Sequence, residues 1–276
     1  MSGLSQPARL AAVAQRLSER DQAIVRDVVR LRFLTAGQLA RLHFSAISQP
    51  VTRIRRVQRT LQRLVDHGLL MRCERRVGGV RAGSASFTYA ATAEGIRLGG
   101  YLDGHGIPRA RAVHEPGISF VDHTVACSEL YVRLIEAARA GAGELLEHQS
   151  EPDCWRVFLG PVGTQLSLRP DAFVALGVGE LEQRSFVEID RGTEGSSALR
   201  RKLSGYLDYW RSGAEQQAHE VFPRVVWQVG SDKRATVLQA LIDELPAPSR
   251  PLFSVTGPAG IVDHLRGADS HRGVDR

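Results

Sequence analysis

The sequence has few of the residues that crosslink small proteins, and it lacks the long apolar runs that anchor proteins in membranes. Its 3 cysteines, Cys73, Cys127 and Cys154, are widely spaced in a chain of 276 residues and form no CxxC pair. Such spacing argues against both a disulfide framework and a zinc site, so we expect reduced thiols in the core. No apolar run approaches the roughly 20 residues that span a bilayer, and charge occurs too early for a secretory signal. We therefore expect a cytoplasmic protein with no membrane partner.

Lysine is also scarce, because 34 of the 36 basic residues are arginine and only Lys202 and Lys233 are lysine. The charge is distributed unevenly along the chain. Residues 1–100 contain 17 Arg against 6 Asp and Glu, whereas residues 101–276 contain 19 basic and 24 acidic residues. An excess of positive charge confined to one part of a chain indicates a polyanionic partner for that part. The length of the chain suits two domains, each with its own core.

The spacing of apolar residues in the basic part predicts three helices. The first begins at Asp21, after which apolar residues recur at intervals of three and four. A short second helix is expected over residues 34–42, where Thr35 and Gln38 have the spacing of a capping box. The third is expected over residues 52–67, and a glycine follows it as a stop signal.

The third predicted helix separates apolar residues from basic ones. At about 100° per residue, one face carries the apolar residues Ile54, Val57, Leu61, Leu64 and Val65. An arc of about 120° on another side carries Arg53, Arg56, Arg59 and Arg63. One face is therefore expected to pack in the core, and the other is available to phosphate groups.

Two predicted strands follow this helix, over residues 69–76 and 86–90, with a Gly-rich turn between them. Three helices followed by a hairpin form a winged helix-turn-helix, whose third helix enters the major groove of DNA. Arg75, Arg76 and Arg81 would add charge at the hairpin, or wing. We therefore predict that residues 1–98 form a winged helix-turn-helix domain that binds double-stranded DNA.

A Gly- and Pro-containing stretch, residues 99–118, is predicted to link this domain to a second one. Over residues 119–266 the order of predicted elements is helix, strands, helix, strand, which indicates an α/β domain with a mixed sheet. The expected fold class is therefore α/β (α+β), with a winged helix-turn-helix before the mixed sheet. Residues 267–276 are expected to be a disordered tail.

Acidic residues occur at the ends of two neighbouring predicted strands. Asp171 begins one strand, and Glu188 and Asp190 close the next, where alternation puts them on one face. Converging carboxylates repel one another unless a cation binds them, and oxygen ligands of this kind suit Mg²⁺ or Mn²⁺. Lys202, on the following helix, could orient a water or stabilise charge during phosphodiester hydrolysis. The alternative is that these carboxylates are solvated or paired with nearby arginines such as Arg191 and Arg200.

The chain resembles the replication-relaxation family of actinobacterial plasmids and mobile elements from about residue 21 to residue 255. The segments that carry the resemblance are LTAGQLARLHF, RRVGGVRAGSASFTYA, DHTVACSELYVRLIEA, EPDCWRVF, LRPDAFVALG, FVEIDRGTEGSSALRRKLSGYLDYWRSG and VFPRVVWQVG. The resemblance implies a role in plasmid replication and in the relaxation of plasmid DNA.

The second half also resembles the PD-(D/E)xK nuclease fold, in which a helix precedes a strand with Asp and then a strand with Glu-x-Lys. Here Asp171, after a proline, matches the first strand motif and Glu188 the second, but Asp190 occupies the lysine position. In that superfamily the lysine can move to the next helix, where Lys202 stands. Glu129, on the preceding helix, could match an additional acidic residue, whereas His123 is interpreted as a structural partner.

Two classes of function are left open by these residues. One is a DNA-binding replication factor or winged-helix transcriptional regulator whose second domain only binds or dimerises. The other is a Mg²⁺-dependent deoxyribonuclease that nicks or cleaves DNA. The absent in-strand lysine favours the first, and the retained Asp171, Glu188 and Lys202 favour the second. The sequence contains no paired tyrosines or three-histidine motif of a relaxase, and whether the chain forms a homodimer is left open.

Overall fold

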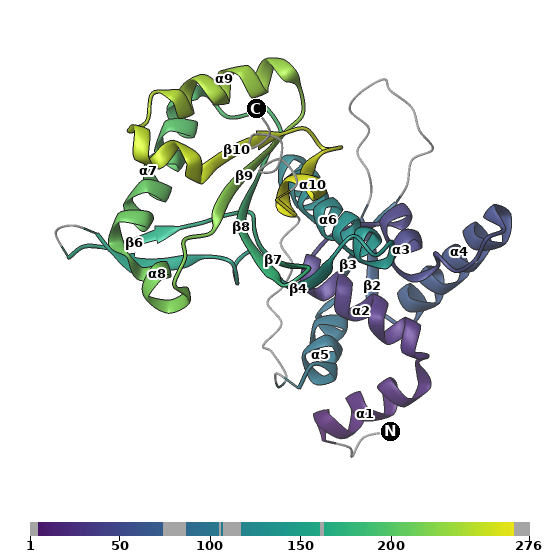
Figure 1. Ribbon diagram of the computed structural model, residues 1–276. Coiled ribbons are helices and arrows are strands. Elements are labelled where there is room, and N and C mark those ends of the chain that lie inside the picture. The colour runs from purple at the N-terminus through teal and green to yellow at the C-terminus, as the bar shows by residue number, and fades with distance from the viewer. Residues whose placement is uncertain (1–4, 74–86, 105, 107–116, 161–162, 268–276) are drawn as a thin grey trace. The chain divides into compact units, whose positions relative to one another are not determined.

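A computed structural model describes residues 5–73, 87–104, 106, 117–160 and 163–267 of the chain (Figure 1). These residues form a mixed α/β protein with a mixed five-stranded sheet, which confirms the predicted class at that level. The chain divides into two compact units, Met1–Val132 and Arg133–Arg276. The division falls within helix α6 (Ile118–Arg139), C-terminal to the linker predicted over residues 99–118.

The first unit contains five helices before α6 in its described part, and a small sheet. The helices are α1 (Gln6–Arg16), α2 (Glu19–Leu31), α3 (Ala36–His43), α4 (Pro50–Asp66) and α5 (Ala93–Leu102). The strands are β1 (Leu34–Thr35), β2 (Leu70–Cys73) and β3 (Thr88–Ala91), which pair antiparallel in the order β1-β3-β2. The three predicted helices correspond to α2, α3 and α4, and the two predicted strands to β2 and β3.

Local signals in the sequence set the ends of these helices. The hydroxyl of Thr35 accepts a hydrogen bond from the backbone N–H of Gln38 at 3.1 Å, and the Gln38 side chain accepts one from the Thr35 N–H at 2.9 Å. The predicted capping box is therefore confirmed, and it satisfies N–H groups that have no partner within the helix. Gly68 follows α4 with φ +67°, a conformation that glycine adopts without strain, as its role of stop signal requires.

The prediction of burial in the core is wrong for one residue of α4. Val57, Leu61 and Leu64 are buried as expected, but Ile54 is 57% exposed. Ile54 lies one turn before the first buried residue of the helix, where α4 extends beyond the packed part of the unit. Helical periodicity identifies the direction in which a side chain points, but not how far along the helix the core reaches.

The sequence did not predict α5 as a helix, because Gly95, Gly99 and Gly100 weaken its helical signal. Two of these glycines allow other parts of the unit to approach closely. A Cβ atom at Gly95 would lie 2.1 Å from the backbone oxygen of Leu69, and one at Gly99 would lie 2.9 Å from a methyl carbon of Val29. Close packing therefore requires glycine inside this helix, against its low helix propensity.

The second unit is built on a five-stranded sheet. Its strands are β4 (Glu144–Ser150), β7 (Ala172–Val178), β8 (Leu181–Asp190), β9 (Arg224–Val229) and β10 (Phe253–Thr256), and a separate pair is formed by β5 (Arg156–Leu159) and β6 (Gln165–Leu168). The order is β10-β9-β8-β7-β4. Strands β4, β7 and β8 are antiparallel neighbours, whereas β8, β9 and β10 run parallel.

The helices of this unit that follow β8 are α7 (Ser196–Ser212), α8 (Ala214–His219), α9 (Asp232–Asp243) and α10 (Ile261–Leu265), with a short 3₁₀ segment at Ala247–Leu252. Leu203 and Tyr206 of α7 and Leu238 of α9 share one core with Phe186 of β8 and Trp227 of β9. The sheet face that carries Phe186 is therefore covered by α7 and α9. Alternation along β8 places Glu188 and Asp190 on this same face.

Within the described residues, none of the helices is both long enough and apolar enough to cross a membrane. The three cysteines are present as thiols. Cys154 is fully buried, and burial, followed by the nearby carboxylates of Glu151 and Asp171, raises its pKa to about 12. Cys73 and Cys127 are only partly buried, so the expectation of core thiols is right for one cysteine of the three.

Candidate functional site

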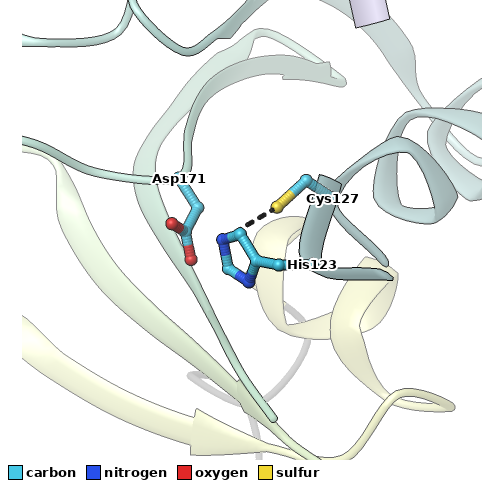
Figure 2. A group of neighbouring side chains, drawn as sticks. All are labelled: His123, Cys127 and Asp171. Atoms are coloured by element: carbon cyan, nitrogen blue, oxygen red, sulfur yellow. Dashed lines mark hydrogen bonds between the residues drawn. The ribbon is translucent and has the colours of Figure 1, made fainter. Parts of the chain in front are cut away.

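The pairing of β7 with β8 brings Asp171 and Glu188 together. Ala172 is the partner of Val187 in this antiparallel pair, so the next position outward places Asp171 beside Glu188. Asp171 precedes β7 (Figure 2), and its backbone N–H donates to the Val187 carbonyl at 3.1 Å. Its carboxylate accepts a hydrogen bond from the backbone N–H of Ile189 at 2.7 Å. The two strands pair as the prediction required, and their register places two of the three predicted carboxylates at neighbouring positions.

Glu188 is buried and held by two side chains of α7. The Lys202 ammonium donates to Oε2 of Glu188 at 2.9 Å, and the Tyr206 hydroxyl donates to Oε1 at 2.7 Å. Lys202 and Tyr206 are one turn apart, so a single face of α7 supplies both donors. Lys202 also lies 3.4 Å from the carboxylate of Glu194, in the loop before α7. With its side chain 33% exposed, Lys202 connects the buried carboxylate to solvent.

Burial and charge act together on the titration of this cluster. Burial, and then the nearby Asp171 carboxylate, raise the pKa of Glu188 to about 8 against the opposing effect of Lys202. Burial tends to lower the pKa of Lys202, but the carboxylates of Glu188 and Asp171 outweigh it and raise the pKa above its ordinary value. Burial and the contact with Glu188 raise the pKa of Tyr206, which keeps its hydroxyl a donor. The cluster therefore combines a cation with two carboxylates that repel each other.

Asp190, the third predicted carboxylate, has other partners. Its Oδ2 accepts a hydrogen bond from Nε of Arg234 in α9, and its Oδ1 accepts one from the backbone N–H of Gly192 at 2.6 Å. The same arginine donates to the carbonyl of Glu194 at 2.9 Å. Asp190 thus ties the end of β8 to α9, and its predicted role as a metal ligand stays a prediction.

The donor set of Asp171 and Glu188 fits a hard divalent cation. Both supply carboxylate oxygens, and each carboxylate oxygen can accept more than one interaction. Burial, and after it their mutual repulsion, raise the pKa of Glu188, and a bound cation would remove that repulsion. Carboxylates in this arrangement suit Mg²⁺ or Mn²⁺, the ions that the sequence predicted.

The arginine-rich side of α4 is the second candidate site. Arg56 and Arg59 are exposed and Arg53 is partly exposed. Arg55, which the sequence interpretation left out, is exposed one turn before Arg59 and so extends the same surface. Among the residues that the structure describes, these four arginines form no ion pair or side-chain hydrogen bond. Its spacing of four residues from Arg59 is the signal that could have identified Arg55 from the sequence.

Arg63 differs from the other arginines of α4. Its Nη2 donates to both carboxylate oxygens of Asp21 in α2, at 2.7 and 2.8 Å, and Asp21 is buried. Arg63 therefore holds α4 to α2 within the unit, and its predicted contact with DNA stays a prediction. Arg75, Arg76 and Arg81, assigned to the wing, lie outside the described residues.

Two further predicted residues on α6 have partners within the first unit. Nε2 of His123 lies 3.6 Å from Sγ of Cys127, one turn along the helix (Figure 2), and its predicted structural role stays a prediction. The carboxylate of Glu129 accepts hydrogen bonds from Arg41 at 2.7 Å and from Gln38 at 3.2 Å. Glu129 thus fixes α6 to α3.

The fold and its sites define a mixed α/β protein with an arginine-rich helix in one unit and a buried carboxylate–lysine cluster in the other. The replication-relaxation family matches residues 25–225, more than half of the chain. The chain therefore belongs to the replication-relaxation family, and membership suggests a role in plasmid replication and relaxation. No curated protein and no solved structure matches it.

Proposed function

We propose that the chain binds double-stranded DNA through a winged helix in its first unit, as part of plasmid replication and relaxation. The observation that carries the proposal is the set of unpaired arginines along one side of α4. The order of α2, α3 and α4 followed by β2 and β3, with β1 completing the sheet, suits a winged helix whose third helix reads DNA.

The charges on α4 favour a polyanion as the partner. Arg53, Arg55, Arg56 and Arg59 lie within two turns, and the first turn of the helix contains no acidic residue. Like charges held this close repel one another, so neutralisation by phosphate groups lowers the electrostatic free energy of this surface. Each phosphate contact releases counterions, which makes the affinity fall as salt rises.

The salt dependence of duplex binding tests this proposal. The Arg56→Ala/Arg59→Ala protein should bind duplex DNA more weakly, and the slope of log affinity against log salt should decrease by about two. The matched control is Arg200→Ala/Arg211→Ala, because these arginines are exposed on α7 in the other unit. If both affinity and slope are the same in wild type and the α4 variant, α4 is not the DNA-binding helix.

The second unit favours a second candidate function, metal-dependent nicking of DNA. The specific observation is the juxtaposition of Asp171, Glu188 and Lys202. The order α6, β4, β7, β8, α7, β9 suits the PD-(D/E)xK fold, with Asp171 before its second sheet strand and Glu188 in its third. The lysine then comes from α7 rather than from the Glu-x-Lys position, which Asp190 fills.

Each residue of the cluster has a distinct part in this candidate reaction. Asp171 and Glu188 would hold Mg²⁺ or Mn²⁺, and the bound ion would lower the pKa of a water and act as a Lewis acid at the phosphate. Tyr206 fixes the orientation of Glu188 through its hydrogen bond. The ammonium of Lys202, partly open to solvent, can orient water or stabilise negative charge at the phosphorus.

Nicking also fits the family name, because one strand break is enough to relax a supercoiled circle. Supercoiled plasmid incubated with Mg²⁺ or Mn²⁺ should become open circular with wild type but not with Asp171→Ala, Glu188→Ala or Lys202→Met. Lys233→Met is the matched control, since Lys233 is the other lysine of the chain and is exposed on α9. An inactive wild type with every metal, or equal activity in all variants, would exclude nicking and leave a DNA-binding protein.

A further inference from the structure

Two large apolar side chains lie exposed at the beginning of α4. Val51 is 60% exposed and Ile54 is 57% exposed. They are three positions apart, so they lie on neighbouring turns of one side of the helix. A single exposed apolar residue is ordinary on a protein surface, but this pair continues the apolar face of α4 beyond the core, with Arg53 and Arg55 about 100° to either side of Ile54. The beginning of α4 therefore carries an exposed apolar strip with a basic side chain on each side of it.

The beginning of α4 is also electrostatically unfavourable in the protein alone. It has neither an acidic residue in its first turn nor a side-chain cap, whereas α2 begins with Glu19 and Asp21 and is capped by Ser18. Positive charge near a helix N-terminus opposes the helix dipole. A polyanion would relieve this penalty. A second copy of the chain meeting the same surface would increase it, because the two arginine-rich faces would repel each other.

We infer that Val51 and Ile54 determine sequence specificity by contacting thymine methyl groups in the major groove. The inference rests on the proposed DNA binding by α4. The first residues of a recognition helix are the ones that reach base edges. In the major groove each thymine presents an apolar C5-methyl group beside hydrogen-bond acceptors, and arginine pairs with guanine or phosphate. The first turns of α4 carry both kinds of complementary side chain.

Uracil substitution tests the inference, because uracil differs from thymine only by the missing methyl group. A duplex is selected with the full-length protein from a random-sequence library and then synthesised with thymine or with deoxyuridine. Binding of both duplexes is measured by fluorescence anisotropy for wild type and for Val51→Ala/Ile54→Ala. Wild type should lose about fourfold in affinity for each contacted methyl group. The variant should bind the thymine duplex as weakly as wild type binds the uracil duplex, and should lose nothing further with uracil.

The controls distinguish a failure of this inference from a failure of the proposed DNA binding by α4. Val51→Ala/Ile54→Ala should keep the wild-type salt slope, because no phosphate contact is removed, and Val221→Ala, an exposed valine of the second unit, should behave as wild type. Both α4 side chains are exposed, so a thermal melt should show an unchanged fold.

An equal uracil effect in wild type and variant, or none in wild type, overturns the inference. A dimer of wild type that the double substitution abolishes also overturns it. A wild type that binds no duplex at low salt overturns the DNA-binding proposal instead.

Discussion

The ammonium of Lys202 lies 2.9 Å from a carboxylate oxygen of Glu188, and this pair joins the third strand of the second unit's sheet, β8, to the helix that follows it. Glu188 is almost completely removed from solvent, whereas Lys202 is partly open. Burial of a carboxylate beside a second carboxylate, Asp171, makes the charged form costly. The consequences are measurable as stability and as metal affinity.

Glu188 should make the stability of the protein depend on pH. Its pKa is raised from 4.5 to about 8 on folding, so between these values the folded protein binds more protons than the unfolded chain. The free energy of unfolding should therefore fall as pH rises through this window, by at most about 1.4 kcal/mol per pH unit. Glu188→Gln should lose that slope in urea titrations. Glu182→Gln, at an exposed position of the same strand, should retain it. A slope shared by all three proteins would contradict the assignment.

Metal binding should depend on the same proton. A carboxylate must be deprotonated to bind a cation, so Mn²⁺ affinity measured by calorimetry should rise with pH up to about 8. Asp171→Asn should bind Mn²⁺ much more weakly while staying folded, because the amide oxygen can still accept the hydrogen bond from Ile189. Asp263→Asn, an exposed carboxylate on α10, serves as the control. Wild-type affinity in Asp171→Asn would remove Asp171 from the metal site.

Two arginines of α4 should separate stability from DNA affinity. Arg63→Ala leaves the buried Asp21 without its ion pair and should reduce the free energy of unfolding by about 1–3 kcal/mol. Arg59→Ala should leave stability unchanged and lower the salt slope of duplex binding by about one. Urea titrations and binding isotherms on both proteins make the comparison. Equal stability of the two variants would show that the Asp21 contact contributes little.

Asp190 and Arg234 should behave as a structural pair. Arg234→Ala leaves a buried carboxylate without its cation and should destabilise the protein by about 3 kcal/mol. Asp190→Asn should destabilise it without changing Mn²⁺ affinity, because the register of β7 and β8 places Asp171 opposite Glu188 and not opposite Asp190. Arg200→Ala, which removes an exposed ion pair with Glu244, should cause no measurable loss of stability. A loss of Mn²⁺ affinity in Asp190→Asn would return Asp190 to the metal site.

Patterns that act over a few residues could be predicted from the sequence. Thr35 and Gln38 form the capping box that their spacing indicated, and the helix predicted over residues 52–67 is present as α4. These features depend on hydrogen bonds and side-chain periods within one element. The match of residues 25–225 to the replication-relaxation family likewise depends on sequence alone.

Contacts between elements could not be predicted in this way. From the sequence, Glu188 and Asp190 were equivalent candidates for metal ligands, because they share a face of β8. Only the packing of the helices decided that Lys202 contacts Glu188 and that Arg234 contacts Asp190. Helical periodicity likewise predicted that Ile54 lies in the core and that Arg63 lies on the DNA-binding surface. In the structure Ile54 is exposed and Arg63 is paired with Asp21. Periodicity along one element fixes the direction of a side chain, but its partner and its burial are decided by the elements that pack around it.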